Sequence, residues 1–306
     1  MSQPNLCFMV GLPGSTKSTY AKQLAKDGYV VHASDIIRAE LGDETDQSKN
    51  SEVFDILNKR VRNDLMSGKD VCLDATNLRR KNRMHMLRML KGIKCHKKCI
   101  VMCVPFEECF DNNLSRERNV PNYAMFKMLE NWQIPIYQEG WDEIEVYYPK
   151  PEYEGYYGDP FAYINELKEY NQGNSHHKLS LGTHMMRAGN WYLANHGSFD
   201  NVAIAAYMHD IGKPLTRSSK NRKGEDDGEV HYYSHHNVGS YLSLFFNMHD
   251  FPWINKQYVA LLIELHMRPH LEWKQSEQKL QKDTNLFGEQ TISDVYRIHD
   301  CDIAAH

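Results

Sequence analysis

Gly11-Leu-Pro-Gly-Ser-Thr-Lys-Ser-Thr19 is the stretch of sequence that decides the fold. It follows a short apolar run at residues 6–10 and leads into a helical pattern at residues 19–26. A glycine-rich loop between a strand and a helix is typical of a phosphate-binding loop. The reason is physical, because backbone N–H groups at a helix N-terminus converge on one point and the helix dipole favours an anion there. We therefore predict a nucleotide-phosphate site in this loop.

Two side chains of the loop carry specific expectations. Lys17 should reach the β- and γ-phosphates of a nucleotide, and the Ser18 hydroxyl should hold Mg²⁺. Thr16 departs from the pattern G-x-x-x-x-G-K-[ST], since its Cβ atom crowds a tight loop that glycine usually serves. A chance turn before a helix is the alternative interpretation. The residues assigned to ATP and Mg²⁺ here are Gly11, Pro13, Gly14, Ser15, Thr16, Lys17, Ser18 and Thr19.

Composition and length set the broad class. The chain has 306 residues, which favours two domains, and a net charge of −4, which neither requires nor excludes a local basic groove. No apolar run approaches the ~18–20 residues of a membrane span, and no signal peptide is evident, so we expect a cytoplasmic protein without membrane contact. The seven cysteines form no CxxC pair, so we expect reduced, mostly buried thiols, with a structural zinc site as the alternative.

Residues 1–148 alternate β-rich runs with helical patterns. The β-rich runs after the loop are 28–33, 71–75 and 99–104, and the helical patterns lie near 51–66, 80–90 and 106–116. Such alternation predicts a parallel sheet covered by helices. Ligands of such sheets bind beyond the carboxyl ends of the strands, which is where the polar motifs of this half fall.

The first of these motifs is Ser34-Asp-Ile-Ile-Arg38. Asp35 could accept a proton from an attacking hydroxyl, and Arg38 could face the same cleft and bind a phosphate. A helix N-cap at Ser34 or Asp35 is the alternative, and it does not account for Arg38.

The second motif, Asp74-Ala-Thr-Asn77, closes another strand. A carboxylate at this position can hold a water of Mg²⁺ or orient a neighbouring base, so Asp74 is assigned to the ATP and Mg²⁺ site. Thr76 and Asn77 are candidate phosphate contacts, and helix capping is the compatible alternative.

Two arginine-rich stretches follow. Arg116 and Arg118, ahead of Pro121, resemble a lid over phosphates, where an arginine would stabilise charge on a transferring phosphoryl group. Taken alone, such a run is more often a solvated surface. The basic helical pattern at residues 79–94 could line a nucleic-acid groove, although a solvated helix face is the favoured interpretation.

Together these motifs resemble the phage-type polynucleotide 5′-kinase over nearly all of residues 5–145. The resemblance rests on GLPGSTKST, SDIIR, DATN and NLSRERNVP in this order, followed by a helical pattern at 122–131. It implies ATP-dependent phosphorylation of a 5′-hydroxyl end of RNA or DNA. It also implies roles for single residues: phosphate and Mg²⁺ binding by Lys17 and Ser18, general base for Asp35, acceptor-phosphate contact for Arg38, support of the site by Asp74, and the lid position for Arg116, with Arg118 left open.

The stretch at residues 146–160 is rich in Tyr, Pro and Gly and interrupts both helix and strand patterns. We place the domain boundary there, with domains at 1–148 and 165–306 and a linker at 149–164. From residue 161 onward the patterns are helical, so the second half is expected to be all-α. The expected helices cover 161–170, 179–195, 202–209, 236–246, 256–265 and 292–305.

Histidine distinguishes the second half, since 13 of the 16 histidines follow residue 170. Imidazole nitrogen and carboxylate oxygen together suit a divalent transition metal, which lowers the pKa of bound water towards neutrality. Satisfied structural histidines are the alternative. The candidate metal-site residues are His184, His209, Asp210, His235, His266 and Asp302.

The stretch Tyr207-Met-His-Asp-Ile-Gly-Lys-Pro214 resembles the signature of the HD phosphohydrolases, and the other histidine motifs follow that family's order over about residues 165–306. The resemblance implies metal-dependent hydrolysis of phosphate esters. It implies one metal site of His184, His209, Asp210 and Asp302, and a second in which Asp210 bridges to His235 and His266. Asp300 competes with Asp302 for the last ligand, and His177 and Lys213 are implied phosphate contacts.

The combined hypothesis is an α/β P-loop kinase domain with a parallel sheet, followed by an all-α HD domain, that heals nucleic-acid ends. The first domain would phosphorylate 5′-hydroxyl ends with ATP and Mg²⁺. The second would remove a 3′-phosphate or 2′,3′-cyclic phosphate with Mn²⁺, Co²⁺, Ni²⁺ or Fe²⁺. RNA is favoured over DNA, with a separate ligase as a further partner. The alternatives are a nucleoside or nucleotide kinase joined to an HD nucleotidase, and an ATP-gated binding module with a degenerate P-loop.

Overall fold

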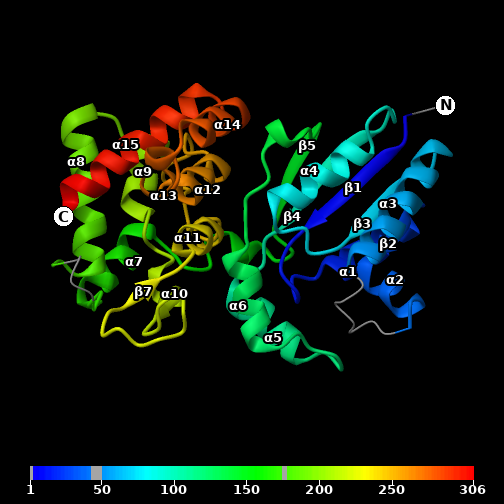
Figure 1. Cartoon of the computed structure of the whole chain (residues 1–306), viewed down its shortest axis with the longest axis horizontal. Coiled ribbons are helices and arrows are strands. Elements are labelled where there is room, and N and C mark those ends of the chain that lie inside the picture. The colour runs from blue at the N-terminus through cyan, green and yellow to red at the C-terminus, as the bar shows by residue number, and fades with distance from the viewer. Residues whose placement is uncertain (1–2, 43–49, 174–177) are drawn as a thin grey trace. The chain divides into compact units, whose positions relative to one another are not determined.

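The computed structural model describes residues 3–42, 50–173 and 178–306 (Figure 1). These residues form two compact units. The first consists of Met1–Met125 and Pro135–Pro149, and the second of Phe126–Ile134 and Lys150–His306.

The first unit is built on a five-stranded sheet in the order β2-β3-β1-β4-β5, with every neighbouring pair parallel. The predicted parallel sheet is therefore confirmed. β1 lies at its centre, and its residues from Leu6 to Val10 are all buried, which is why this run is continuously apolar. The strands are β1 (Asn5–Val10), β2 (Val30–Ala33), β3 (Val71–Asp74), β4 (His96–Met102) and β5 (Glu143–Tyr147).

The helices of this unit follow the strands in alternation, as the pattern predicted. α1 and α3 both pack on β2 and β3. The core face of α3 consists of Val53, Leu57, Val61 and Leu65, spaced one helical turn apart and almost fully buried. The helices are α1 (Lys17–Lys26), α2 (Ser34–Glu40), α3 (Asn50–Met66), α4 (Arg80–Met89) and α5 (Phe106–Leu114), with a short 3₁₀ turn η1 (Tyr137–Glu139) before β5.

Two arginines of the basic helix α4 differ from both interpretations of its sequence, whereas Lys81 and Arg88 on the same helix are exposed, as a solvated face predicts. Arg83 is fully buried, and its guanidinium bonds both carboxylate oxygens of buried Glu139, at 2.7 and 2.6 Å. Arg80 is also buried and lies 3.3 Å from the same carboxylate, which accepts a further bond from the Trp141 indole. These two arginines therefore face neither a nucleic-acid groove nor solvent, because they hold α4 to the turn before β5.

The second unit is a helical assembly in which α8, α9, α12 and α15 pack against one another. Every residue of α9 from Val202 to Met208 is buried, as expected of a helix at the centre of a core. The helices of this unit are the end of α6 (Asn122–Glu130), α7 (Pro160–Glu166), α8 (Leu181–His196), α9 (Asn201–Met208), α10 (Lys213–Thr216), α11 (His235–Ser243), α12 (Lys256–Leu265), α13 (Arg268–Leu271), α14 (Glu277–Phe287) and α15 (Glu289–Ala305).

The expectation of an all-α second half needs one correction. β6 (Arg217–Ser218) and β7 (His231–Tyr232) form a two-stranded antiparallel ribbon at the base of the charged loop. The ribbon is held by Arg217, whose guanidinium donates to the Tyr232 hydroxyl at 3.0 Å and to the backbone oxygen of Asn171 at 2.9 Å. Strands of two residues leave no periodic signal in a sequence.

Residues 126–134 precede the predicted linker, yet they pack in the second unit. Trp132 is fully buried there and meets the ring of Tyr241 edge-on, with centroids 4.8 Å apart. The backbone N–H of Ile134 donates to the buried carboxylate of Glu264 at 2.9 Å. The Asn237 side chain donates to the Glu130 carbonyl at 2.7 Å. This segment, Phe126–Ile134, is called the strap below.

All seven cysteines are buried and free. None of them takes part in a group with metal-ligand geometry in the described part of the chain. None of the described helices combines the length and apolar character that crossing a lipid bilayer requires.

Candidate functional site

The glycine-rich loop of the first unit has a strained and close-packed backbone. Thr16 precedes α1 with φ 62° and ψ 14°, in the left-handed region that β-branched residues rarely adopt. Gly14 has φ 79°, and a Cβ there would lie 2.1 Å from the Cys109 carbonyl oxygen. A Cβ at Gly11 would lie 2.6 Å from the Ser15 hydroxyl oxygen. The loop thus needs glycine at Gly14, where the positive φ and a backbone contact both exclude a side chain, and it is tightly packed at Gly11. Thr16 occupies a strained backbone conformation.

Lys17 starts α1 and is buried inside the loop. Its ammonium donates to the Leu12 carbonyl at 2.6 Å and to the Ser15 hydroxyl at 3.1 Å. Burial lowers the pKa of Lys17, the charges of Asp74 and Asp35 oppose that change, and the charge of Arg116 adds to it. The four predicted site residues Lys17, Asp35, Asp74 and Arg116 are therefore electrostatic neighbours.

Asp35 and Arg38 lie one turn apart on α2 and form an ion pair of 2.8 Å. The Arg38 side chain is only 7% exposed, whereas that of Asp35 is 61% exposed. The residue before the helix is Ala33, and no side chain caps its N-terminus, so the capping alternative for Ser34 and Asp35 is not what the structure contains. A buried guanidinium thus orients an accessible carboxylate.

The Asp74-Ala-Thr-Asn77 motif joins the carboxyl ends of β1 and β3. The Thr76 carbonyl accepts from the N–H of Gly11 at 3.1 Å. The Asn77 side chain donates to the carbonyls of Met9 at 2.8 Å and of Ala75 at 3.3 Å, and Asn77 itself has φ 49°. These bonds fix the start of the glycine-rich loop. Phosphate contact by either residue stays a prediction.

The segment between α5 and α6 is a loop closed at its base. The buried amide of Asn113 donates to the Val120 carbonyl at 2.8 Å and accepts from the Val120 N–H at 2.9 Å. Asn112 next to it donates to the carbonyl of Gly14 in the glycine-rich loop at 3.0 Å. Arg116 and Arg118 are exposed on this loop. The loop is thus anchored at its base and carries exposed cations, and its role as a lid, with Arg116 or Arg118 as the acting arginine, stays a prediction.

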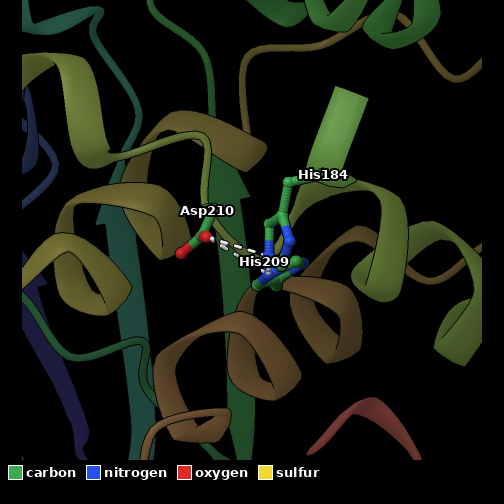
Figure 2. A group of neighbouring side chains, drawn as sticks. All are labelled: His184, His209 and Asp210. Carbon is green, nitrogen blue, oxygen red and sulfur yellow. Dashed lines mark hydrogen bonds and ion pairs between the residues drawn. The ribbon is translucent and has the colours of Figure 1, made fainter. Parts of the chain in front are cut away.

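In the second unit, Asp210 lies between two pairs of histidines. Its Oδ2 atom is 3.5 Å from Nε2 of His184 and 3.3 Å from Nε2 of His209, the pair drawn in Figure 2. Its Oδ1 atom is 3.2 Å from Nε2 of His235 and 3.8 Å from Nε2 of His266. Each oxygen of the carboxylate therefore faces two imidazole nitrogens. In this arrangement a carboxylate can bridge two metal ions.

Asp302 on α15 completes the first of these groups. Its Oδ1 atom lies 3.1 Å from Nε2 of His184 and 3.6 Å from Nε2 of His209. Asp300 is exposed instead, because it stands two positions earlier on the same helix and faces another direction. The structure therefore places Asp302, and not Asp300, at the cluster.

Backbone carbonyls fix the tautomer of three of these histidines. Nδ1 of His209 donates to the Ala206 carbonyl at 2.8 Å, Nδ1 of His235 to Tyr232 at 2.7 Å, and Nδ1 of His266 to Ile263 at 2.7 Å. Since a carbonyl only accepts, each Nδ1 carries a proton, and in the neutral form of each ring the lone pair of Nε2 points inward. Second-sphere bonds of this kind are the usual support of metal-bound histidines.

The Nε2 atoms of His235 and His266 lie only 3.3 Å apart, so in the neutral rings their lone pairs face each other. Such a pair repels unless a proton or cation lies between the nitrogens. Burial acts to lower the pKa of His209, but the charges of Asp210 and Asp302 outweigh it and raise that pKa to about 10. The two carboxylates thus favour positive charge at His209, whereas burial lowers the pKa of His184 and of His266 and favours their neutral, lone-pair-bearing form. Nitrogen and carboxylate donors of this kind fit a divalent metal.

Lys213 and His177 complete the predicted set. The buried ammonium of Lys213 pairs with Oδ2 of Asp210 at 2.7 Å and donates to the side-chain oxygen of Gln172 at 2.8 Å. Burial acts to raise the pKa of Asp210, but Lys213 and His209 hold it well below its ordinary value. Lys213 thus keeps the carboxylate of Asp210 ionised and in place. His177 lies outside the described residues.

The sequence did not point to His270 and His306 as neighbours of Asp302. Nε2 of His270 lies 3.5 Å from Oδ2 of Asp302, and Nε2 of His306 lies 3.5 Å from Oδ1 of Asp302. The signal for His306 was present, because a residue four positions after Asp302 lies on the same face of a helix. No comparable spacing links His270 to the cluster, so its position depends on tertiary structure.

Two family models match separate stretches of the chain. Residues 6–135 match a family model described as an AAA domain, and residues 181–300 match one described as an HD domain. Solved structures that match include chains of the Pnkp1/Rnl/Hen1 complex and of the Pnkp1/Rnl/Hen1 RNA repair complex, at 21% and 22% identity, over 40% and 43% of this chain, with TM-scores of 0.35 and 0.39. The matches cover 42% and 44% of those chains, so this chain spans less than half their length.

A third match is a gluconokinase from Sinorhizobium meliloti 1021, at 15% identity and a TM-score of 0.37. It covers 49% of this chain and 86% of the gluconokinase.

Proposed function

We propose that this chain, in which a P-loop domain of the AAA type precedes an HD domain, is a two-site enzyme that heals broken nucleic-acid ends. The observation that carries the proposal is that each unit holds its own set of residues for phosphate chemistry. The first has the glycine-rich loop with Lys17, Asp35 and Arg38, and the second has Asp210 between two pairs of histidines. The two sets share no residue, so two different reactions are supported.

In the first unit, the proposed reaction is phosphoryl transfer from ATP to a 5′-hydroxyl. Lys17 and the N–H groups at the start of α1 bind the phosphates. Ser18, with support from Asp74, would hold Mg²⁺, which when bound would supply charge neutralisation at the phosphates. Asp35 accepts the proton of the 5′-hydroxyl. At the same time the hydroxyl oxygen bonds the γ-phosphorus, and the bond between the γ-phosphorus and ADP breaks. Arg38 orients Asp35 and contacts the acceptor phosphate, with Thr76 and Asn77 as further phosphate contacts. An arginine of the lid, Arg116 in our assignment, stabilises the charge in transfer.

In the second unit, the proposed reaction is hydrolysis of a 3′-phosphate or of a 2′,3′-cyclic phosphate. His184, His209, Asp210 and Asp302 would hold one divalent metal, and Asp210, His235 and His266 a second. When bound, such a metal makes water acidic enough to supply hydroxide near neutral pH. Lys213 keeps Asp210 ionised, and phosphate contact is proposed for Lys213 as for His177. The nitrogen-rich donors favour Mn²⁺, Co²⁺, Ni²⁺ or Fe²⁺ over Mg²⁺.

The proposed substrates are the ends of RNA, since only RNA forms a 2′,3′-cyclic phosphate when its chain is cut by its own 2′-hydroxyl. The products, a 5′-phosphate and a 3′-hydroxyl, are the ends that a ligase joins, so a separate ligase is the expected partner. A nucleotide kinase fused to an HD nucleotidase remains the alternative, because the same residues serve phosphate transfer to a small acceptor.

Competition between acceptors tests the proposal. The protein is incubated with ATP labelled at the γ-phosphate, Mg²⁺, and equal concentrations of a 5′-hydroxyl RNA oligonucleotide and of nucleosides and 3′-mononucleotides. We expect the label on the oligonucleotide. Label confined to the small acceptors would support the nucleotide-kinase alternative, and absence of any ATP turnover would support the degenerate binding module.

A further inference from the structure

We infer that His306 is an additional protein ligand of the metal held by His184 and Asp302. The two metal positions of the second unit then differ in the number of coordination sites that protein atoms occupy. The inference rests on the proposed metal site but on no particular substrate. It assigns a structural, tightly held ion to one position and an open, phosphate-binding ion to the other.

The geometry around His306 carries this inference. One ligand atom each from His184, Asp302 and His306 lies within 4.8 Å of the others. Nε2 of His306 is 3.5 Å from Oδ1 of Asp302, and the rings of His184 and His306 have centroids 4.9 Å apart. Donors on a metal lie ~2.0–2.2 Å from it, so two donors of one ion are at most about 4.4 Å apart. The three atoms need only small movements to share an ion.

The helix α15 explains why these groups meet. Asp302 and His306 are four residues apart, at the end of this helix, and therefore lie on one face. The His306 side chain is 37% exposed, whereas that of His184 is 1% exposed. His306 thus closes the cluster from the solvent side, where His184 and His209 approach from the buried side.

A separate third metal does not fit the same atoms. His184 turns one nitrogen, Nε2, towards His209, Asp210 and Asp302 alike. One imidazole nitrogen has one lone pair and binds one ion. The group containing His306 therefore extends the first metal position and does not create a new one.

The two positions then have different numbers of protein donors. His184, His209, Asp210, Asp302 and His306 supply five to the first, whereas Asp210, His235 and His266 supply three to the second. An octahedral ion in the first position keeps one free site, and one in the second keeps three. Substrate phosphate is thus expected at the ion bound by His235 and His266.

His270 offers a matched control. Its Nε2 is also 3.5 Å from an oxygen of Asp302, and its side chain is 38% exposed, close to the value for His306. It faces the opposite carboxylate oxygen, however, and belongs to no group with metal-ligand geometry among the described residues. Replacing His270 removes a neighbour of Asp302 without removing a donor.

The test measures metal binding by the whole chain without substrate. Wild type, His306→Ala and His270→Ala are stripped of metal, checked for an unchanged unfolding temperature, and titrated with Co²⁺ while the visible d–d absorption and the bound stoichiometry are recorded. We expect two ions of unequal affinity in wild type and in His270→Ala. His306→Ala should bind the tighter ion about tenfold or more weakly, with a changed absorption band. Added imidazole should restore the wild-type band in His306→Ala.

Three results would overturn the inference: a wild-type titration and band in His306→Ala, an equal effect of His270→Ala, or a changed band that imidazole does not restore. Failure of wild type to bind any Co²⁺ would instead contradict the proposed hydrolytic site as a whole. Because no RNA is present, the outcome does not depend on which phosphate ester the enzyme cleaves.

Discussion

At the scale of single residues, the phosphate-binding loop is built around strain at Thr16. Its φ of 62° is one that glycine adopts freely, and a residue with a side chain held there costs about 1–3 kcal/mol. Its carbonyl accepts from the N–H groups of Thr19 at 3.0 Å and Tyr20 at 3.2 Å, so this strained residue starts α1. The sequence pattern showed that glycine was missing, and the structure shows that the position needs a glycine-like backbone.

We predict that Thr16→Gly raises the unfolding temperature, corresponding to roughly 0.5–1 kcal/mol after the entropy cost of glycine, and lowers the KM for ATP. Ser234→Gly is the matched control, since Ser234 has φ 59° and precedes α11 in the second unit. It should raise stability similarly and leave the KM for ATP unchanged. A higher KM in Thr16→Gly would count against the interpretation of Thr16 as strain without function.

At the scale of elements, the loop between α5 and α6 depends on one side chain. Asn113, at the start of the loop, makes two hydrogen bonds to the backbone of Val120 at its end, and the Asn113 side chain is fully buried. We predict that Asn113→Ala lowers kcat of the kinase about tenfold, because Arg116 and Arg118 would no longer be held near the transferring phosphate. Asn112→Ala, which removes only a bond to Gly14, should raise the KM for ATP with a smaller change in kcat. Steady-state kinetics with RNA and ATP measures both, and an unchanged kcat in Asn113→Ala would contradict the lid.

The strap is the second element with a testable role. Trp132 is buried against Tyr241 in the second unit, so Trp132→Ala should cost that unit about 3–5 kcal/mol. Trp141→Ala is the control in the first unit, where Trp141 packs on Phe8 with ring centroids 4.9 Å apart. Heat inactivation separates the two: Trp132→Ala should lose end hydrolysis at a lower temperature than kinase activity, and Trp141→Ala the reverse. The opposite order would show that the strap serves the first unit.

At the scale of the whole molecule, much of the fold could be predicted from the sequence. The buried strands β1 and β3 and the second half of β4 are mostly apolar runs, and the loop before α1 carries its own motif. β5 was missed because Glu143 and Glu145 alternate with apolar residues at the sheet edge, which weakens the signal of a buried strand. The burial of Arg83 and the packing of the strap depend on contacts between distant parts of the chain, which no local pattern contains.

The metal cluster was predictable in a different way. The residue types indicated a metal, but only the family resemblance brought His184, Asp210 and Asp302 together from distant helices. Spacing alone would have allowed either Asp300 or Asp302, and the direction of α15 decided for Asp302. The position of His270 beside Asp302 follows from the packing of α13 near α15 and has no sequence signal.

Because the two candidate sites share no residue, we predict that mutation separates the two activities. Lys17→Ala and Asp35→Ala should abolish 5′ phosphorylation and leave hydrolysis of the 3′ end intact. Asp210→Ala should lose bound metal and end hydrolysis while the kinase remains active. Metal content by atomic emission and end analysis of labelled RNA measure these outcomes. Loss of kinase activity in folded Asp210→Ala would contradict the model of two independent sites.

The most direct test of the central claim is one mass measurement on one RNA. A short RNA with a 5′-hydroxyl and a 2′,3′-cyclic phosphate is incubated with the wild-type protein, ATP, Mg²⁺ and Mn²⁺. The mass of the intact product is then measured by mass spectrometry. We predict a product that has gained a phosphate at the 5′ end and lost the phosphate from the 3′ end. If bound metal is first removed with a chelator and only Mg²⁺ is then added back, the 5′ phosphate should still be gained and the 3′ phosphate should not be lost. An RNA recovered with both ends unchanged, from a protein that still consumes ATP, would contradict it.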